Sequence, residues 1–486
     1  MMNNIQKIIG LILFIVLLSG CEDKGYGTQD INVVPSVTTT QDMTIINSIP
    51  KENGNVAQRA YLHVAFSSYI DEATVTTSQV RLEDINDSID LPISFLVVRN
   101  FLYIKPLTSL IPTKHYKLHI SGLQDIFGNV LAQSYEFSYV CDSDFWEEVV
   151  AGNTNAMAKS KVGDLYIWGS NAPLPLDTNE EKSIFLSIDM PLPVPKSKNV
   201  KSFATGTSGM AIATQKGELV NIGAHAYTDL ENFDYKAVGI GRDHSVVLKE
   251  DGTIYSWGSN SYGQLGNLRL LDQEKPEQEY TEATDWSAIS TRTNFTLALK
   301  EDGSLWGWGD NSEGELGNPY DIVPLPKPID TNGTNISKWK QVSAGGNHTV
   351  ALGDDNTTWS WGKNSSGELG NASFEQSRTA VQEASTSKWS FISAGFDHTV
   401  AIRDDGTLWA WGNNGSGQLG DNNTGNSNIP VQEASSVTTW ITIGAGNKCT
   451  FGIKDDGTLW TWGSNFGMRL GLDDSLDATS VPMEVK

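Results

Sequence analysis

Positive charge is scarce in this sequence. Its 486 residues include 34 Lys and Arg against 58 Asp and Glu, which gives a formal net charge of −24 at pH 7. Binding to nucleic acid phosphates without sequence preference requires Lys and Arg on the contact surface. The chain also contains no basic run that would supply a local patch. We therefore expect no nucleic acid partner.

The motifs of common catalytic and metal centres are absent too. The chain has no His-Glu-x-x-His, no Cys-x-x-Cys, no Gly-x-Ser-x-Gly and no P-loop. The zinc, redox, hydrolase and nucleotide sites that these motifs build are therefore not indicated. We predict that the protein is not an enzyme and that it holds no cofactor and no metal.

Long hydrophobic runs are missing. The longest, Ile8–Leu18, is shorter than the stretch of about 20 apolar residues that crosses a bilayer as a helix. It follows Lys7 and leads into Leu18-Ser19-Gly20-Cys21, an order typical of a targeting segment. These four residues resemble the bacterial lipobox, in which the peptide is cut before the cysteine and the cysteine is acylated.

This resemblance implies that residues 1–21 are a lipoprotein signal peptide with Cys21 as the lipidation site. Several acyl chains would then anchor the protein stably to a membrane. An ordinary signal peptide and a membrane anchor are the alternatives. We expect an extracytoplasmic protein of the bacterial cell envelope, at the outer membrane or cell surface. Residues 22–42 are mostly polar and are expected to form a flexible tether.

Tryptophan is lacking before Trp146, although the chain has 15. Residues 43–141 instead contain short apolar runs separated by turn residues, which predicts a β-sandwich. The expected strands are Tyr61–Phe66, Val80–Leu82, Leu91–Val98, Phe101–Ile104, Tyr116–Ile120 and Tyr135–Val140. Phrases such as Tyr103–Pro106 and Gly122–Asn129 resemble bacterial Ig-like domains. Such domains usually act as spacers, and a binding role is the alternative.

The later part of the chain is built from a repeat. Trp-Gly steps begin at Trp257, Trp308, Trp361, Trp411 and Trp462, at spacings of 51, 53, 50 and 51 residues. A period of this size indicates a solenoid or a propeller. Each copy has an apolar run, a turn and an aromatic run, which predict a β-hairpin. A run ending in Ala-Gly before it and a short run after it complete the four strands of a propeller blade.

The turn of this hairpin has a constant backbone requirement. Four copies place glycine there, as at Gly406, and the fifth has Asn356. Both residue types tolerate a positive φ, so the exchange preserves the turn.

Two weaker copies, around Gly163–Gly169 and Gly217–Gly223, precede the five clear ones and make seven. The consensus W-x4-AG-x2-HT-x-AL-x2-DG-x-LW-x-WG-x-N-x2-GQLG resembles the repeat of the regulator of chromosome condensation family over Trp146–Lys486. The resemblance implies a seven-bladed β-propeller across residues 142–486. The expected fold class is therefore all-β, with an N-terminal Ig-like β-sandwich followed by the propeller.

Three copies carry a histidine at one position, namely His244, His348 and His398. Equivalent positions on different blades converge only if they point into the channel. We interpret these histidines as structural residues at a strand end, not as metal ligands. Acidic turns such as Asp404-Asp405 lack the ligand spacing of an EF-hand and are expected to be solvated.

Paired tryptophans such as Trp409 and Trp411 lie on one face of their strand. We expect them in the core between blades rather than as ligand platforms.

The main functional hypothesis is a protein–protein interaction module. An unknown protein partner would bind one propeller face through variable loops, for which the candidates are Leu174–Met190, Pro319–Asn335 and Asp421–Asn428. A carbohydrate-binding propeller is an alternative and needs exposed Trp or Tyr beside Asp or Asn. An enzyme with a site in the channel is another, and it needs inward carboxylates or histidines from several blades.

Cysteine is rare, because only Cys141 and Cys449 accompany Cys21. Ring closure would make the first and last blades neighbours, and an exported protein meets an oxidising compartment. Cys141 and Cys449 are therefore a candidate disulfide, with two free buried thiols as the alternative. The final run, Val481–Val485, pairs either with the first blade or with the last as its outer strand. The stretch 223–235 is short, which leaves open whether a connecting strand forms there.

Overall fold

The structure is a computed structural model that describes residues 42–50, 54–58, 60–142, 145–174, 184–194, 200–206, 209–223, 234–331, 333–385, 387–472 and 476–485. The predictions for residues 1–21 and for almost all of the tether lie outside these ranges. Within them the secondary structure is strand, apart from two single-turn 3₁₀ helices, η2 (Glu72–Thr74) and η3 (Phe466–Met468). No described helix is long and apolar enough to cross a membrane. The all-β prediction is confirmed.

The first nine strands form two sheets, with the orders β1-β3-β7-β6 and β2-β9-β8-β4-β5. They are β1 (Ile45–Ile49), β2 (Gly54–Val56), β3 (Leu62–Phe66), β4 (Val80–Asp84), β5 (Ile89–Leu91), β6 (Ile93–Val98), β7 (Phe101–Pro106), β8 (His115–Ile120) and β9 (Tyr135–Cys141). Both sheets contribute to one core, which includes Val64, Leu102 and Leu118. All six predicted strands are present, and β1, β2 and β5 were not foreseen.

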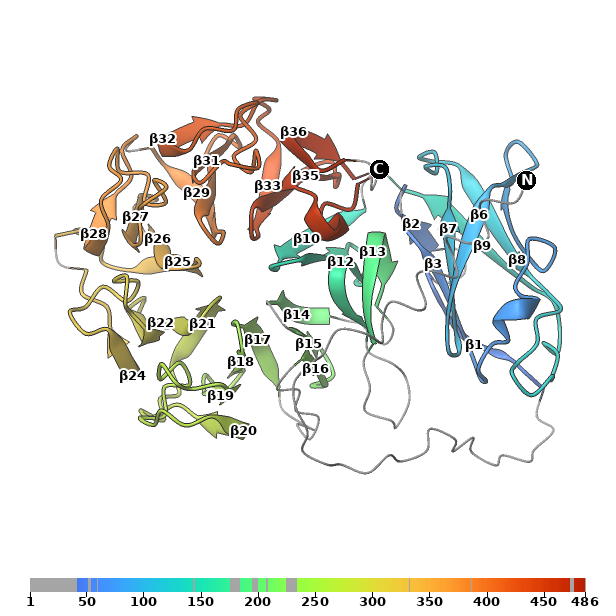
Figure 1. Cartoon of the computed structure of the whole chain (residues 1–486), viewed down its shortest axis with the longest axis horizontal. Helices are drawn as coiled ribbons and strands as arrows, with labels where there is room; N and C mark the ends of the chain where they lie inside the picture. Colours follow the sequence, from blue (N-terminus) through green and yellow to red (C-terminus); the bar gives the residue numbers. More distant parts are fainter. Residues whose placement is uncertain are drawn as a thin grey trace, which may run out of the picture. The chain divides into compact units, whose positions relative to one another are not determined.

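The remaining strands form seven antiparallel sheets over the described residues, each from strands that are consecutive in the chain (Figure 1). They are β10 (Trp146–Ala151), β11 (Asn155–Ser160), β12 (Leu165–Leu174) and β13 (Ile184–Pro193); β14 (Val200–Thr205), β15 (Gly209–Thr214) and β16 (Leu219–Gly223); β17 (Tyr235–Ile240), β18 (His244–Lys249), β19 (Ile254–Gly258) and β20 (Gln273–Gln278); β21 (Trp286–Thr291), β22 (Phe295–Lys300), β23 (Leu305–Asp310) and β24 (Ile322–Pro328); β25 (Trp339–Ala344), β26 (His348–Gly353), β27 (Thr358–Gly362) and β28 (Ser377–Gln382); β29 (Trp389–Ala394), β30 (His398–Arg403), β31 (Leu408–Gly412) and β32 (Ser427–Gln432); and β33 (Trp440–Ala445), β34 (Cys449–Lys454), β35 (Leu459–Ser464) and β36 (Ala478–Glu484).

These sheets are the blades of a propeller, and we number them one to seven in chain order. The first strand of each blade lies nearest the centre of the ring (Figure 1). Blade two has three strands in its described part. The sequence left open whether a fourth strand follows Gly223, and residues 224–233 lie outside the described residues. The sheet count agrees with the seven repeats found in the sequence.

The ring closes where blade seven meets blade one. The backbone N–H of Asn447 donates to the carbonyl of Gly152 at 3.2 Å, and that of Trp146 donates to Gly457 at 3.0 Å. The run Val481–Val485 belongs to β36, which pairs with β35 as the outer strand of blade seven. Of the two pairings left open by the sequence, this one is observed.

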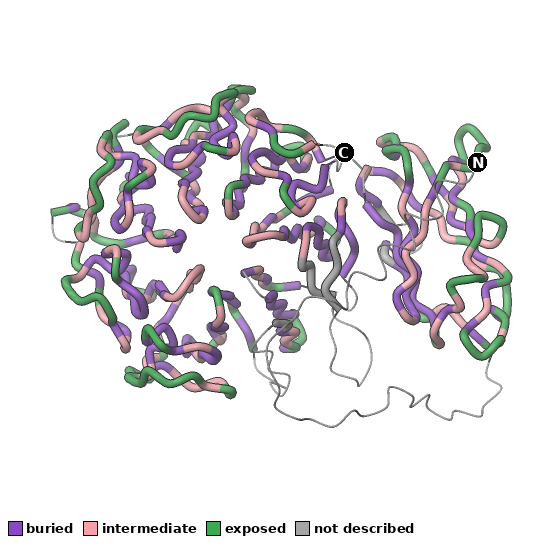
Figure 2. Tube along the Cα trace, viewed as in Figure 1, coloured by how far each residue is buried: buried purple, intermediate pink, exposed green. Residues whose placement is uncertain are grey.

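Tryptophan side chains fill the space between blades. None of the 15 is exposed, and buried residues follow the strands while exposed ones gather on the outer loops (Figure 2). Trp411 Nε1 donates to the carbonyl of Glu368 in the preceding blade at 2.9 Å, and Trp462 Nε1 donates to that of Gln418 at 3.0 Å. Burial of a tryptophan removes about 200 Å² from water, which contributes about 5 kcal/mol before entropy losses. The prediction of core tryptophans is confirmed.

Three of the four partly buried tryptophans, Trp306, Trp409 and Trp460, have a cation over the ring. The guanidinium carbon of Arg403 lies 3.5 Å from the centre of the Trp409 ring, and Lys454 Nζ lies 3.6 Å from that of Trp460. Such contacts occupy the ring face that a ligand would need. The hairpin turns also follow the sequence, since Gly406 has φ 80° and Asn356 has φ 66°.

Candidate functional site

One end of the propeller carries two connections from each of blades three to seven. In an antiparallel four-stranded blade, the first and third connections emerge at the same end. We call this end the loop face. In blades three to seven it consists of the turns 241–243, 292–294, 345–347, 395–397 and 446–448 and the loops 259–272, 311–321, 363–376, 413–426 and 465–477, the last without residues 473–475.

Buried asparagines fix the shape of these loops. In blade five, Asn364 Nδ2 donates to the carbonyls of Ser373 and Glu375 at 3.0 Å each, and its Oδ1 accepts the N–H of Leu369 at 2.9 Å. Asn260, Asn311, Asn414 and Asn465 make the same kinds of bond in their own blades. A polar side chain that satisfies several backbone groups holds a loop in one conformation. The loop face is therefore a preformed surface.

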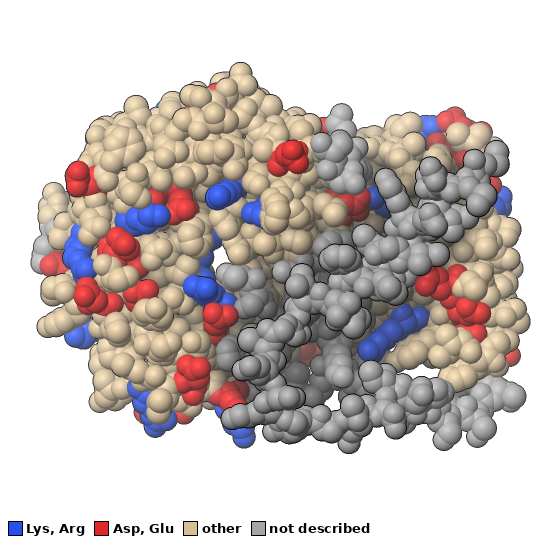
Figure 3. Space-filling view, viewed as in Figure 1, with Lys and Arg blue, Asp and Glu red and all other residues tan. Residues whose placement is uncertain are grey.

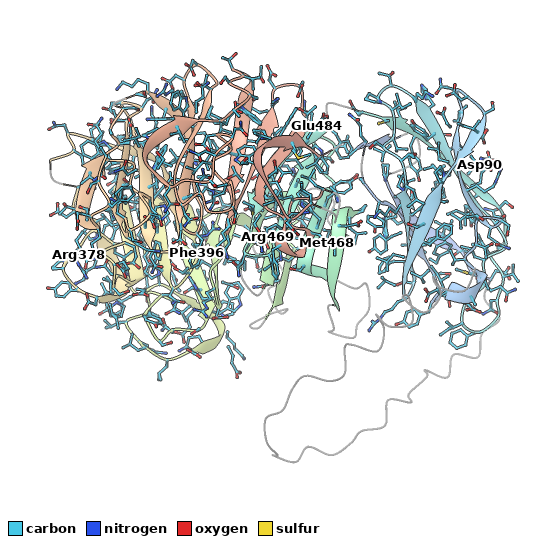
Figure 4. All side chains as sticks on the ribbon, turned by 45° about the horizontal axis from the view of Figure 1, so that its top comes forward. Asp90, Arg378, Phe396, Met468, Arg469 and Glu484 are labelled. Carbon is cyan, nitrogen blue, oxygen red and sulfur yellow. The ribbon has the colours of Figure 1, made fainter. Side chains whose placement is uncertain are left out.

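Exposed apolar side chains occur on the loops of blades three, four, five and seven. They are Tyr262, Leu268, Leu270 and Leu271 in blade three, Tyr320 in blade four, Phe374 in blade five and Phe466 in blade seven, with exposed fractions between 40% and 75%. Arg378, in β28 of blade five, ties that blade to the loop 311–321 of blade four, because its Nη2 donates to the Ser312 carbonyl at 3.0 Å and to Asp321 at 2.8 Å (Figure 4). Exposed apolar side chains gathered at one end of a domain make that end a candidate interaction surface.

The three loops predicted from sequence need correction. Ile184–Met190 belongs to strand β13, which pairs with β12, and residues 175–183 lie outside the described part. Pro319–Asn335 contains strand β24, and Asp421–Asn428 ends within β32. Strand β24 contains Pro324, Pro326 and Pro328, which an outer strand tolerates because one of its edges is unpaired.

A channel of about 290 Å³ runs between the first strands of the blades and is lined by all seven of them. Figure 3 shows its opening, with positively charged side chains on the rim. Its described lining has small residues such as Gly239 and Ser343, and a single carboxylate, that of Glu148. Burial raises the pKa of Glu148, while Lys159 at 3.3 Å lowers it. Carboxylates or histidines converging from several blades, as a channel enzyme would need, are not found in this lining.

The repeated histidines lie between blades. His348 Nε2 is 3.0 Å from Thr399 Oγ1 in the next blade, and this hydroxyl donates to the carbonyl of Glu368 at 2.9 Å. Because Thr399 donates its hydroxyl proton to Glu368, it can only accept from His348, so the His348 imidazole must donate from Nε2. His244 with Thr296 and His398 with Thr450 repeat the arrangement at 3.2 and 3.0 Å. Burial lowers the pKa of all three imidazoles to about 3, so they are neutral.

No metal site forms from these histidines. Among the residues that the structure describes, no group of three His, Cys, Asp or Glu side chains is arranged to hold a metal ion. The interpretation of His244, His348 and His398 as structural strand-end residues agrees with their hydrogen bonds.

One buried position distinguishes the repeats, and its role was not predicted from the sequence. It holds Gln264, Glu315, Glu368, Gln418 and Arg469 in blades three to seven. Burial raises the pKa of Glu315 to about 7, against the opposing effect of its hydrogen bonds. Asn347 Nδ2 donates to Glu315 Oε1 at 3.2 Å. The residue type at this position thus decides which charges are buried between blades.

Arg469 uses that position to join the last blade to the first (Figure 4). Its Nη1 donates to the carbonyls of Asn153 at 3.0 Å and Asn447 at 2.6 Å, and its Nε donates to Phe466 at 2.7 Å. In the other direction, Trp168 Nε1 of blade one donates to the Arg469 carbonyl at 2.9 Å. Hydrogen bonds from a charged donor are stronger than neutral ones.

Both cysteines of the candidate disulfide are free and buried. Cys141 ends β9 in the core of the sandwich, whereas Cys449 begins β34 in a hydrophobic cluster of the propeller. Because each thiol is packed into a different core, the predicted bond between them is not formed, and the alternative of two buried thiols is the observed one. Burial raises the pKa of Cys449 to about 11 and that of Cys141 to about 12, so both stay protonated.

The comparison with known families covers most of this chain. Residues 224–486, more than half of the chain, match the model of the RCC1-like domain. The chain belongs to the RCC1-like domain family. Residues 39–140 match the model of a bacterial Ig-like domain, in agreement with the two sheets formed by β1–β9.

Relatives of this RCC1-like chain include two proteins of Arabidopsis thaliana. The ultraviolet-B receptor UVR8 is 28% identical over 244 residues, which cover 46% of this chain and 54% of the receptor. The mitochondrial RCC1 domain-containing protein RUG3 is 27% identical over 350 residues, 66% of either chain. The chain therefore spans half to two thirds of these relatives. The solved structure of human WBSCR16 aligns with a TM-score of 0.56 at 19% identity, over 66% of this chain and 88% of that one, which supports the fold.

Proposed function

We propose that this RCC1-like protein is a lipid-anchored protein of the bacterial cell envelope whose propeller binds a partner protein through the loop face. The proposal rests on the exposed apolar side chains of the loop face, carried on loops whose backbones are fixed by buried asparagines. A preformed surface loses little conformational freedom on binding, which favours affinity. Aromatic side chains are the residues that most often dominate binding energy at protein interfaces.

Carbohydrate binding is the second proposal, and Tyr320 beside Asp321 is the arrangement that it would use. Lys327 Nζ lies 4.7 Å from the centre of the Tyr320 ring, and Asp321 already accepts a bond from Arg378. The ring face and the carboxylate that a sugar would need are therefore engaged within the protein. This observation favours a protein partner.

The test uses the soluble protein from Gly25 onward to capture proteins of the cell envelope. Substitution of Tyr320→Ser together with Phe374→Ser removes two exposed aromatic side chains from neighbouring loops. We expect this variant to lose the captured partner, whereas Ile441→Ser, an exposed apolar position at the opposite end, keeps it. Equal capture by all three proteins would contradict the proposal. Binding of the wild type to a glycan array, lost in the double variant, would favour the carbohydrate alternative.

A further inference from the structure

Blade four departs from the other blades at a position that faces the channel. Three residues before the second strand begins, six blades have glycine, and blade four has Arg292. The glycines are Gly152, Gly206, Gly241, Gly345, Gly395 and Gly446. A Cβ at Gly345 would stand 2.4 Å from Cε1 of His348, so the strand-end histidine requires glycine there. In blade four the histidine is replaced by Phe295, and the position is free to hold a long side chain.

The Arg292 side chain reaches across the ring. Its Nη1 donates to the carbonyls of Ala394 at 3.0 Å and Ala445 at 2.9 Å, which lie in blades six and seven. A guanidinium has five N–H groups, and the three on Nε and Nη2 have no acceptor among the described residues. No described carboxylate forms an ion pair with Arg292. Burial lowers its pKa to about 10, so it remains charged at neutral pH.

Hydroxyl groups surround the same part of the channel. Ser290, Ser343 and Ser393 each accept a backbone N–H of the next blade, at 2.9 to 3.0 Å, which leaves their own O–H groups to donate elsewhere. Thr291 Oγ1 is buried and has no hydrogen-bond partner within the described structure. All four residues line the channel together with Arg292. Buried polar groups without partners are rare and mark a site where a further group belongs.

We infer that the channel binds a small organic carboxylate, held by the guanidinium of Arg292 and by the hydroxyls of Thr291 and the neighbouring serines. A guanidinium presents paired N–H groups that match the two oxygens of a carboxylate. One buried positive charge is balanced by one negative charge, which favours a monoanion over a phosphate dianion. The lining also includes the partly buried apolar residues Ile289 and Phe391, beside which a short hydrocarbon body fits. The channel volume lies at the lower end of the range for small-molecule sites.

The inference is tested by titrating the mature full-length protein with sodium acetate, butyrate, benzoate and inorganic phosphate at constant ionic strength, using calorimetry. We expect saturable binding of a carboxylate, tighter for butyrate or benzoate than for acetate. Arg292→Gly restores the residue of the other blades and should weaken binding at least tenfold. Thr291→Val keeps the side-chain shape and should weaken it several-fold. Arg242→Ala is the matched control, because it removes an exposed charge within the turn 241–243 of blade three and should bind like the wild type.

Three outcomes would overturn the inference. The first is no saturable binding of any carboxylate to the wild type. The second is equal binding by Arg292→Gly and the wild type. The third is tighter binding of phosphate than of every carboxylate. If Arg292→Gly lowers the thermal midpoint, Arg292→Lys provides the second measurement. It keeps the charge without the paired donors and should bind more weakly than the wild type by several-fold.

Discussion

The buried carboxylate of Glu315 makes stability depend on pH. Its pKa is raised by burial to about 7, whereas an exposed glutamate titrates near 4.3. Below pH 4 the Glu315 carboxyl is protonated in both the folded and the unfolded state. As pH rises towards 7 the unfolded state ionises while the folded state stays protonated, so stability is lost over this interval.

Glu315→Gln should remove this loss. Glutamine already occupies the equivalent positions Gln264 and Gln418, so the amide fits between blades. We expect the free energy of unfolding to rise at pH 8 by on the order of 1–3 kcal/mol and to be unchanged at pH 4, as measured by urea denaturation. Gln264→Glu is the reverse substitution at the equivalent position of blade three. It should make stability fall in the same way as pH rises. If the unfolding free energies of Glu315→Gln and the wild type differ by the same amount at pH 4 and pH 8, the prediction is contradicted.

The histidine–threonine bonds between blades give the opposite pH response. With the pKa of His398 lowered by burial to about 3, stability is complete above pH 6.5 and is lost as the unfolded state gains a proton during acidification. Phe295 shows that a phenyl ring is accepted at this strand end. His398→Phe should lower stability at pH 7 by about 1 kcal/mol through loss of the bond to Thr450. The difference should shrink as pH falls to 5, and a difference that grows with acid would refute this account.

At the scale of elements, β36 completes the last blade rather than the first. Met483 pairs with Thr461 and Glu484 with Trp460, and the N–H of Val485 donates to Leu459 at 2.8 Å. Deletion of residues 481–486 should leave the β35 edge unpaired and lower the thermal midpoint. An unchanged midpoint would show that this half of the strand contributes nothing to stability.

Closure of the ring depends on the contact between blades seven and one. Arg469→Gln restores the residue of blades three and six but cannot reach the carbonyls of Asn153 and Asn447. Two charge-assisted bonds are then lost, which should cost about 2–4 kcal/mol in unfolding free energy. Gln418→Ala, at the junction of blades six and seven, is the comparison at an ordinary contact and should cost less. If Arg469→Gln lowers the unfolding free energy by less than Gln418→Ala does, other contacts between blades seven and one hold the ring closed.

Sequence patterns predicted these elements unevenly, for physical reasons. The hairpins were predictable because each copy repeats the same apolar runs around a turn that needs positive φ, as at Gly406 and Asn356. Strands β2 and β5 are three residues long and exist through pairing with a neighbour, so they leave no pattern of their own. Strand β24 was hidden by prolines that only an edge strand tolerates.

At the scale of the whole molecule, the repeat indicates the ring, but the exceptions to the repeat indicate its special contacts. Arg292 stands where the six other blades have glycine, and Arg469 stands where blades three to six have glutamine or glutamate. An alignment of the copies reveals that they differ. It does not reveal that Arg292 crosses the channel while Arg469 joins two blades, because these directions follow from the three-dimensional positions of the carbonyls that they reach. The candidate disulfide failed for the same reason, since nearness of blades does not bring two particular thiols together.

Attachment of the whole molecule to a membrane is the final prediction. It rests on the sequence Leu18-Ser19-Gly20-Cys21 after an apolar run. Each acyl CH₂ buried in lipid contributes about 0.8 kcal/mol, so several chains on one residue hold the protein firmly. Cys21→Ala should therefore move the protein from the membrane fraction to the soluble fraction after alkaline washing, whereas Cys141→Ala should leave it membrane-bound. Retention of the Cys21→Ala variant in washed membranes would show that another segment anchors the chain.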